Sequence, residues 1–321
     1  MPLKIPFGRR GMESKKRKKD TVTAVKPLRS SSRGISERVR TDLACESVTP
    51  AAEVSEETVA AGLSPVTITR RREEDGARSV TLALGRITER GEGDLPALAE
   101  LLAKELRRMA SVLLGRAPDP ACRILVAGLG NPHMTPDVIG PGTVRRMTVT
   151  RHLKGYDESL FTALGCCELA AISPGVLGQT GMESGELVKC AAELVKPHLI
   201  VAVDALAARR VERLSSTIQL SDRGISPGAG IGNRRLAIDR ETMGCPVLGV
   251  GVPTVVDSST LVWDALERAG MSGGEIPPAL EEVLETGRSF IVSPKDSDEV
   301  VELTCRLLAR GVDLAFGVGE M

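Results

Sequence analysis

The stretch "CRILVAGLGNPHMTPDVIGP", Cys122 to Pro141, joins a short apolar run to a loop rich in glycine and proline. The run from Ile124 to Ala127 is typical of a buried strand, and Gly128 and Gly130 allow the chain to turn tightly at its end. The loop then leads to Asp137. Such a loop is compatible with a phosphate cradle, a nucleic-acid contact, a helix cap or a carboxylate placed for chemistry.

The same order of apolar strand, loop and helix recurs along the chain. Loops that begin at Gly128, Ser173, Asp204 and Gly251 each follow an apolar run, and helical patterns stand between the runs. This alternation predicts an α/β fold with a mainly parallel or mixed sheet flanked by helices. Because ligands and catalytic groups gather at the carboxyl ends of such strands, we expect these loops to meet in one crevice.

The charges are divided unevenly along the chain. Residues 1–40 hold 13 Lys and Arg against 3 Asp and Glu, a net charge of +10, and the remainder holds 29 against 39, a net charge of −10. A basic segment with few core-forming residues is typical of a disordered leader. We expect a leader over residues 1–42 and a single α/β domain over residues 43–321, with an acidic body suited to a basic protein partner.

Several elements are expected inside this domain. The strands "VTITRRRE" and "SVTLALG" around the turn "EDGA" predict an added hairpin over residues 66–90. Residues 120–260 are the expected catalytic core, and the acidic stretch 48–65 is expected to be a linker or a short helix. Apolar spacing predicts further helices over residues 95–115, 142–153 and 296–316.

Composition argues against several classes of function. Aromatic residues make up only 2% of the chain, which disfavours base-stacking platforms for single-stranded nucleic acid. We expect no membrane partner, because no apolar run is long enough to span a bilayer and no secretory leader is recognisable. The seven cysteines lack a CxxC pair and the three histidines lack zinc-site spacing, so reduced thiols and no metal or other cofactor are expected.

Three chemistries compete for the glycine-rich loop. Dinucleotide binding requires G-x-G-x-x-G, but His133 occupies the third glycine position. The segment "GLGNP", followed by "TRH" at Thr150 to His152, resembles peptidyl-tRNA hydrolase, although Leu153 follows the histidine and the motif lies in mid-chain. Alternatively, Asp137 and Asp204 on neighbouring strand ends can share a proton, so that one activates water and the other acts as an acid.

Each aspartate also has a structural alternative. Asp137 follows a proline and is suited to capping a helix. Asp204 stands five and six residues before Arg209 and Arg210, either of which is a possible ion-pair partner. The residues alone leave these alternatives open.

Five separated blocks, taken together, resemble the spore germination protease family, whose endopeptidases degrade small acid-soluble spore proteins. The blocks are "GLGNPHMTPDVIGP", "SPGVLGQTGMES", "VAVDALAARR", "TIQLSDRGISPGAGIGNRR" and "GCPVLGVGVPTVVDSSTLV". The resemblance implies an α/β core similar to the hydrogenase maturation proteases and a catalytic pair at Asp137 and Asp204. It also implies a cytoplasmic location in the forespore and spore core, suggests a homotetramer and gives no reason to expect a direct nucleic-acid contact.

Members of that family are made as zymogens that remove an N-terminal propeptide. The sequence "TDLACE", Thr41 to Glu46, is similar to the T-E-[FI]-A-x-E sequence at which the family cuts, so we expect self-cleavage between Asp42 and Leu43. The leader is longer than the usual propeptide, and Met12 is an alternative start. An acidic residue before the cut needs a cation in the crevice, and the candidates are Arg223, Arg234 and Arg235.

Overall fold

The computed structural model describes residues 39, 41–46, 51–227, 235–271, 277–287 and 290–319, all of which lie in one compact unit, Arg33–Met321. Most of the expected leader, together with Arg234, lies outside the described residues.

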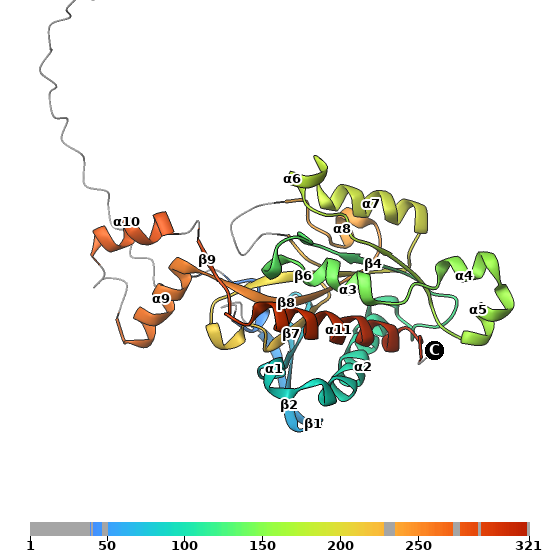
Figure 1. Cartoon of the computed structure of the whole chain (residues 1–321), viewed down its shortest axis with the longest axis horizontal. Coiled ribbons are helices and arrows are strands. Elements are labelled where there is room, and N and C mark those ends of the chain that lie inside the picture. Colours follow the sequence, from blue (N-terminus) through green and yellow to red (C-terminus); the bar gives the residue numbers. More distant parts are fainter. Residues whose placement is uncertain are drawn as a thin grey trace, which may run out of the picture. The chain divides into compact units, whose positions relative to one another are not determined.

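A nine-stranded mixed sheet forms the centre of this described part of the chain (Figure 1). Its strand order is β1-β2-β3-β7-β8-β6-β4-β5, and β9 pairs with β8. Parallel pairing joins β5, β4, β6 and β8, and the remaining pairs are antiparallel. The strands are β1 Ala51–Ala61, β2 Ser64–Glu73, β3 Arg78–Ala83, β4 Arg123–Gly128, β5 Glu168–Ile172, β6 Leu199–Ala208, β7 Thr217–Ser221, β8 Val247–Asp257 and β9 Ile291–Val292.

Helices cover both faces of the sheet, which confirms the predicted α/β fold class (Figure 1). The α-helices are α1 Ile87–Arg90, α2 Leu95–Leu114, α3 Ile139–Arg146, α4 Arg151–Tyr156, α5 Glu158–Leu164, α6 Leu177–Thr180, α7 Ser184–Val195, α8 Arg240–Met243, α9 Ser258–Arg268, α10 Pro278–Gly287 and α11 Ser297–Ala315. Short 3-10 helices occupy η2 Ala44–Glu46, η3 Glu92–Asp94, η4 Thr135–Asp137 and η5 Val211–Arg213. Across the described residues, every helix is too short or too polar to span a membrane.

The two faces bury separate apolar clusters. Ile124 and Val126 of β4 join the cluster under α2, α3 and α11, whereas Leu125 and Ala127 join the cluster under α7 and α8. This division follows from the pleat, because successive side chains of a strand point to opposite faces. Strands covered on both faces need near-continuous apolar sequence, which explains the runs in β4, β6 and β8.

Residues 51–61 form strand β1, so the predicted linker or short helix is wrong there. Most of these side chains are exposed, and the strand is held by its antiparallel backbone pairing with β2. A strand stabilised at the edge of a sheet in this way shows little apolar alternation. Its sequence therefore carries a weak strand signal.

The helix predicted over 142–153 is interrupted. Helix α3 ends at Arg146, and α4 begins at Arg151. Between them, the Thr150 hydroxyl donates to the Cys167 carbonyl at 2.7 Å and accepts from the Leu169 amide at 2.9 Å. These bonds compete with helical pairing in a segment whose β-branched residues favour extended backbone.

A buried arginine fastens the β1–β2 hairpin to the start of α2. Arg90 is 6% exposed. Its guanidinium donates to the carbonyls of Ala61, Ser64 and Pro65 at 3.0, 2.9 and 2.7 Å, and it pairs with Asp94 at 3.4 Å. A single side chain therefore satisfies carbonyls that the hairpin turn leaves without ladder partners.

We expect Arg90→Met to lower the free energy of unfolding by roughly 3–5 kcal/mol, because it leaves Asp94 and several carbonyls buried without their donor. Urea unfolding measures this loss. The matched control is Arg86→Met, since Arg86 is 55% exposed and pairs with Asp296 in solvent. Its loss should stay below about 1 kcal/mol, and equal losses in the two variants would contradict the role of Arg90.

Candidate active site

Asp137 lies in the loop that follows β4. The loop folds back over the strand end, and the Asn131 amide donates to Asp137 Oδ2 at 2.8 Å. Gly130 makes this approach possible, because it has φ of +117° and a Cβ there would stand 2.0 Å from the Asp137 carbonyl oxygen. Gly130 of the "GLGNP" segment thus allows Asp137 to lie close to the end of β4. Asp137 is the last residue of η4 and does not cap the start of a helix.

Asp204 lies on β6, in the middle of the parallel part of the sheet. Its side chain accepts from its neighbour, the Ala205 amide, at 2.9 Å, and the residue is only 6% exposed. The prediction that a loop begins at Asp204 is wrong, because β6 continues to Ala208 alongside β8. The continuation carries a register shift between Leu206 and Ala207 and is stabilised by pairing with β8, which also runs past Gly251 without a loop.

Two hydrogen bonds fix the Asp137 loop against these strands. The Leu129 amide donates to the Val203 carbonyl of β6 at 2.8 Å. The Thr254 hydroxyl of β8 donates to the Pro136 carbonyl at 2.6 Å. The loop is thereby joined to β6 and β8. Asp137 and Asp204 line the same cavity, of about 170 Å³.

The two carboxyl groups differ in their surroundings. Burial raises the pKa of Asp137, which remains partly exposed. Burial raises the pKa of Asp204 much further, and the negative charges of Asp137 and Asp42 add to that rise. Asp204 is therefore the member of the pair that retains a proton more readily, and Asp137 is the member that ionises first.

The segment Thr41 to Glu46 lies along the same site. The Asp42 amide donates to the Ala207 carbonyl at 2.9 Å, and the Ala207 amide donates back to Asp42 Oδ2 at 2.9 Å. Asp42 also lines the cavity that contains Asp137 and Asp204. Asp42, the residue before the expected cut, is therefore held beside the aspartate pair.

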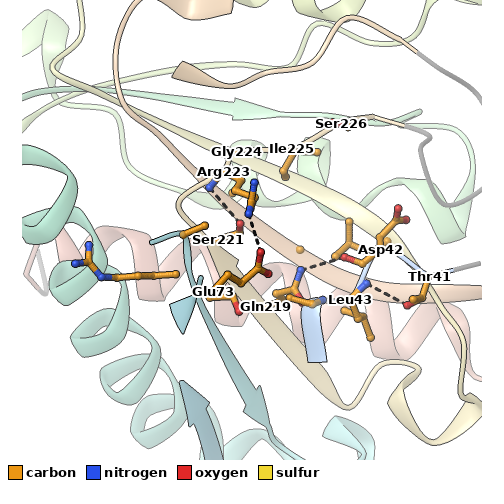
Figure 2. A pocket seen from close by; sticks show the side chains of 17 residues that line it. Thr41, Asp42, Leu43, Glu73, Gln219, Ser221, Arg223, Gly224, Ile225 and Ser226 are labelled. Atoms are coloured by element: carbon orange, nitrogen blue, oxygen red, sulfur yellow. Dashed lines mark hydrogen bonds and ion pairs between the residues drawn. The ribbon is translucent and has the colours of Figure 1, made fainter. Parts of the chain in front are cut away.

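The residues after Asp42 are also bound. Leu43 is 1% exposed and packs with Leu206, Leu214 and Val256. The Ala44 amide donates to Gln219 Oε1 at 2.6 Å, and Gln219 Nε2 donates to the Asp42 carbonyl at 3.2 Å. Figure 2 shows Gln219 beside Asp42 and Leu43, and all three residues line a second cavity.

Glu46 ends the bound segment. Its carboxylate accepts from the Arg209 amide at 2.7 Å, the Arg210 amide at 3.1 Å and the Thr41 hydroxyl at 2.5 Å. Glu46, the fourth residue after the expected cut, is thus bound by main-chain N–H groups just beyond β6. The Arg209 side chain is engaged elsewhere, with Asp264, and not with Asp204.

The three candidate arginines are placed differently. Arg235 lines the cavity with both aspartates, and its positive charge partly offsets the raised pKa values there. Arg223 lines the second cavity, where its guanidinium pairs with Glu73 at 2.7 Å (Figure 2). The same guanidinium also pairs with Asp75. Arg234 lies outside the described residues.

Several binding groups were not found from the sequence. Gln219 is buried in the strand "TIQLS". Its only signal in the sequence was a polar residue between two apolar residues of a predicted strand. The amides of Ala207, Arg209 and Arg210 had no signal at all, because every non-proline residue carries the same group.

The competing chemistries have less support in the geometry. His152, which the peptidyl-tRNA hydrolase resemblance would make catalytic, is exposed on α4 and packs against Tyr156, 6.5 Å away between ring centroids. His133 is exposed, and its amide donates to the side chain of Asn131. Within the described ranges, no three His, Cys, Asp or Glu side chains gather closely enough to hold a metal ion.

Known proteins similar to this chain agree on one family. The family model described as germination protease matches residues 56–269. The germination protease of Caldanaerobacter subterraneus subsp. tengcongensis is 38% identical, over 88% of this chain and 95% of that protein. Those of Clostridium acetobutylicum and Clostridium tetani are 36% and 32% identical, over 74% and 86% of this chain and 77% and 95% of their own lengths.

Among solved structures, the [NiFe] hydrogenase maturation protease HycI from Thermococcus kodakarensis KOD1 is similar over 52% of this chain and 92% of its own, with 16% identity and a TM-score of 0.26. The sequence matches cover the strands and loops that carry Asp137 and Asp204. This chain belongs to the germination protease family.

Proposed function

We propose that this peptidase is a zymogen that cuts its own chain between Asp42 and Leu43 and then initiates degradation of small acid-soluble, DNA-binding spore proteins during germination. One observation carries the proposal: Asp42, from the expected cleavage sequence, lines the cavity that contains Asp137 and Asp204. Residues of that sequence on both sides of the cut are bound along the same site.

The aspartate pair supplies the chemistry in this scheme. Asp137, ionised, accepts a proton from a water molecule whose oxygen attacks the Asp42 carbonyl carbon. Asp204, protonated, donates its proton to the Leu43 nitrogen as the C–N bond breaks. The products are a carboxylic acid at Asp42 and an amine at Leu43, and exchange of a proton with solvent returns the pair to its starting state.

Specificity comes from contacts along the bound segment. The Ala207 amide and the nearby Arg235 suit an acid before the cut, the buried site of Leu43 suits a bulky apolar residue after it, and the amides beyond β6 suit a glutamate at the fourth position. Arg223 and Arg234 remain candidate substrate-binding residues.

The division of charge fits the same scheme. Residues 1–40, with a net charge of +10, are attracted to the remainder of the chain, with a net charge of −10, and so are basic substrates that bind DNA. We place the protein in the forespore and spore core, as a homotetramer without a cofactor, a membrane partner or a direct nucleic-acid contact.

Asp137→Asn and Asp204→Asn should each slow self-cleavage by at least about 100-fold, since each removes one proton-transfer step. Mass spectrometry of the purified chain over time measures the appearance of a fragment that begins at Leu43. The same variants are then incubated with a basic protein carrying a T-E-[FI]-A-x-E site.

The matched control for these variants is Asp313→Asn, because Asp313 is also buried and its pKa is also raised, but its partner is Thr148. It should cut at the wild-type rate within about threefold. Full cleavage by both site variants would eliminate the aspartate pair, and a new N-terminus elsewhere than Leu43 would eliminate the assigned cut. A wild type that cleaves no protein but releases amino acids from peptidyl-tRNA would favour the alternative hydrolase.

The rate of cleavage should depend on pH as a bell-shaped curve. It falls at low pH as Asp137 becomes protonated, and it falls at high pH as Asp204 loses its proton. Because burial raises the pKa of Asp137, the acid limb should lie above about 3.9, the ordinary value for aspartate. An acid limb at or below that value would contradict this assignment.

The free energy of unfolding should depend on pH in the way that the raised pKa of Asp204 requires. A carboxyl with a raised folded-state pKa contributes stability that is present below its unfolded pKa, about 3.9, and lost as pH rises through the folded value. Asp204→Asn should therefore be more stable than the wild type at pH 7, and the difference should vanish below about pH 4.

Asp296→Asn is the control, and its effect on the free energy of unfolding should have the opposite sign, because the hydrogen bond from Arg86 lowers the pKa of Asp296. That variant should be less stable than the wild type at pH 7. Urea unfolding at several pH values measures both differences, and an Asp204→Asn variant that is less stable at pH 7 would indicate a structural ion pair instead of a catalytic carboxyl.

Glu46→Gln should slow self-cleavage about 10-fold, because it weakens the charge-assisted bonds from the Arg209 and Arg210 amides while keeping the shape of the side chain. The measurement is again the rate at which the Leu43 fragment appears. Glu56→Gln is the control, since Glu56 is exposed on β1, and equal rates in the two variants would count against recognition of the fourth residue.

A further inference from the structure

Gln219 occupies an unusual position for an amide side chain. It lies on β7, between Thr81 of β3 and Gly251 of β8 in the sheet register, and it is 7% exposed. An amide buried in a sheet is stable only when its donors and acceptors are satisfied. Here the bound segment supplies partners for both ends of the amide, and Figure 2 shows the contact with Asp42.

The two contacts enclose the expected cut. Gln219 Nε2 donates to the Asp42 carbonyl, which is the carbonyl of the bond between Asp42 and Leu43. Gln219 Oε1 accepts from the Ala44 amide, one residue beyond that bond. The orientation of the amide is fixed by this pair of partners, because only the nitrogen can donate to a carbonyl and only the oxygen can accept from an N–H.

Gln219 and the aspartate pair both neighbour Asp42, although they do so from different cavities. Asp42 lines one cavity with Asp137 and Asp204 and the other with Gln219. When water attacks a carbonyl carbon, negative charge develops on the carbonyl oxygen, and a fixed donor to that oxygen stabilises the transition state. The Gln219 Nε2 group is such a donor at 3.2 Å before any reaction begins.

We propose that Gln219 is a substrate-binding catalytic residue that donates to the carbonyl oxygen of the cleaved bond and accepts from the amide of the second residue after it. The inference rests on the proposed cut between Asp42 and Leu43. Both contacts are made to main-chain atoms, so they do not depend on the side chains of the segment. Gln219 therefore acts in the same way on the protein's own segment and on any substrate bound in this register.

Two variants separate the two contacts. Gln219→Glu keeps an acceptor for the amide but removes the donor to the carbonyl, and Gln219→Leu removes both. We expect kcat on a peptide containing Thr-Glu-Ile-Ala-Ala-Glu to fall roughly 100- to 1000-fold in each, as for other donors to a developing oxyanion. Self-cleavage of the full-length variants should fall by a similar factor, and thermal unfolding checks that each variant is folded.

A substrate change tests the second contact directly. Replacing the first alanine of the peptide by lactate converts the N–H that Gln219 accepts from into an ester oxygen. In the wild type and in Gln219→Glu, kcat/KM should fall about 2- to 10-fold for the ester, as expected for one lost hydrogen bond. In Gln219→Leu the ester should cause no further loss, a coupling that a merely structural role would not produce.

The outcomes distinguish this inference from the function on which it rests. A wild type that cuts the peptide, with kcat unchanged in Gln219→Leu or with equal ester losses in all three proteins, overturns the role of Gln219 and leaves the aspartate pair standing. A wild type that does not cut the peptide or itself overturns the proposed function, and the role of Gln219 with it.

Discussion

Two carboxyl groups that face one small cavity repel each other whenever both are ionised, and this repulsion is the constraint on which the site depends. Asp137 and Asp204 are held in that relation by hydrogen bonds that join the loop after β4 to the Val203 carbonyl of β6 and to the Thr254 hydroxyl of β8. Burial raises the pKa of Asp204, the repulsion adds to that rise, and the ionised pair therefore destabilises the folded chain near neutral pH. The apolar clusters on both faces of the sheet supply the opposing stability.

The same sheet holds the segment Thr41 to Glu46 beside that pair. Its backbone is held by Ala207 and Gln219, and its two acidic side chains are held largely by main-chain amides. Amides fixed in a folded backbone lose little entropy on binding, whereas arginine side chains must first be ordered. Binding of the acidic side chains of this segment therefore does not require a large number of arginines. Among the described residues that line the cavity of the pair, Arg235 is the cation.

The α/β class could be predicted from the sequence, because apolar runs mark buried strands. The placement of Asp137 and Asp204 in one crevice could also be predicted, because parallel strands align their carboxyl ends. It did not reveal that β6 continues through Asp204, since this depends on pairing with β8 across a register shift. Strand β1 was missed because backbone pairing stabilises it with little burial. Gln219 was missed because a single buried amide has no motif, and its proposed role depends on a partner 177 residues away.

In the proposed scheme, the position of Glu46 has a consequence for the chain after the cut before Leu43. Glu46 and Ala51, the first residue of β1, are five residues apart, so Glu46 stays within ~17 Å of β1 even when the connection is fully extended. Under the proposed cut, Leu43 to Glu46 therefore remain tethered beside their own binding site after the leader departs. An intramolecular competitor on so short a tether has an effective concentration on the order of millimolar, which an incoming substrate must exceed through affinity or abundance.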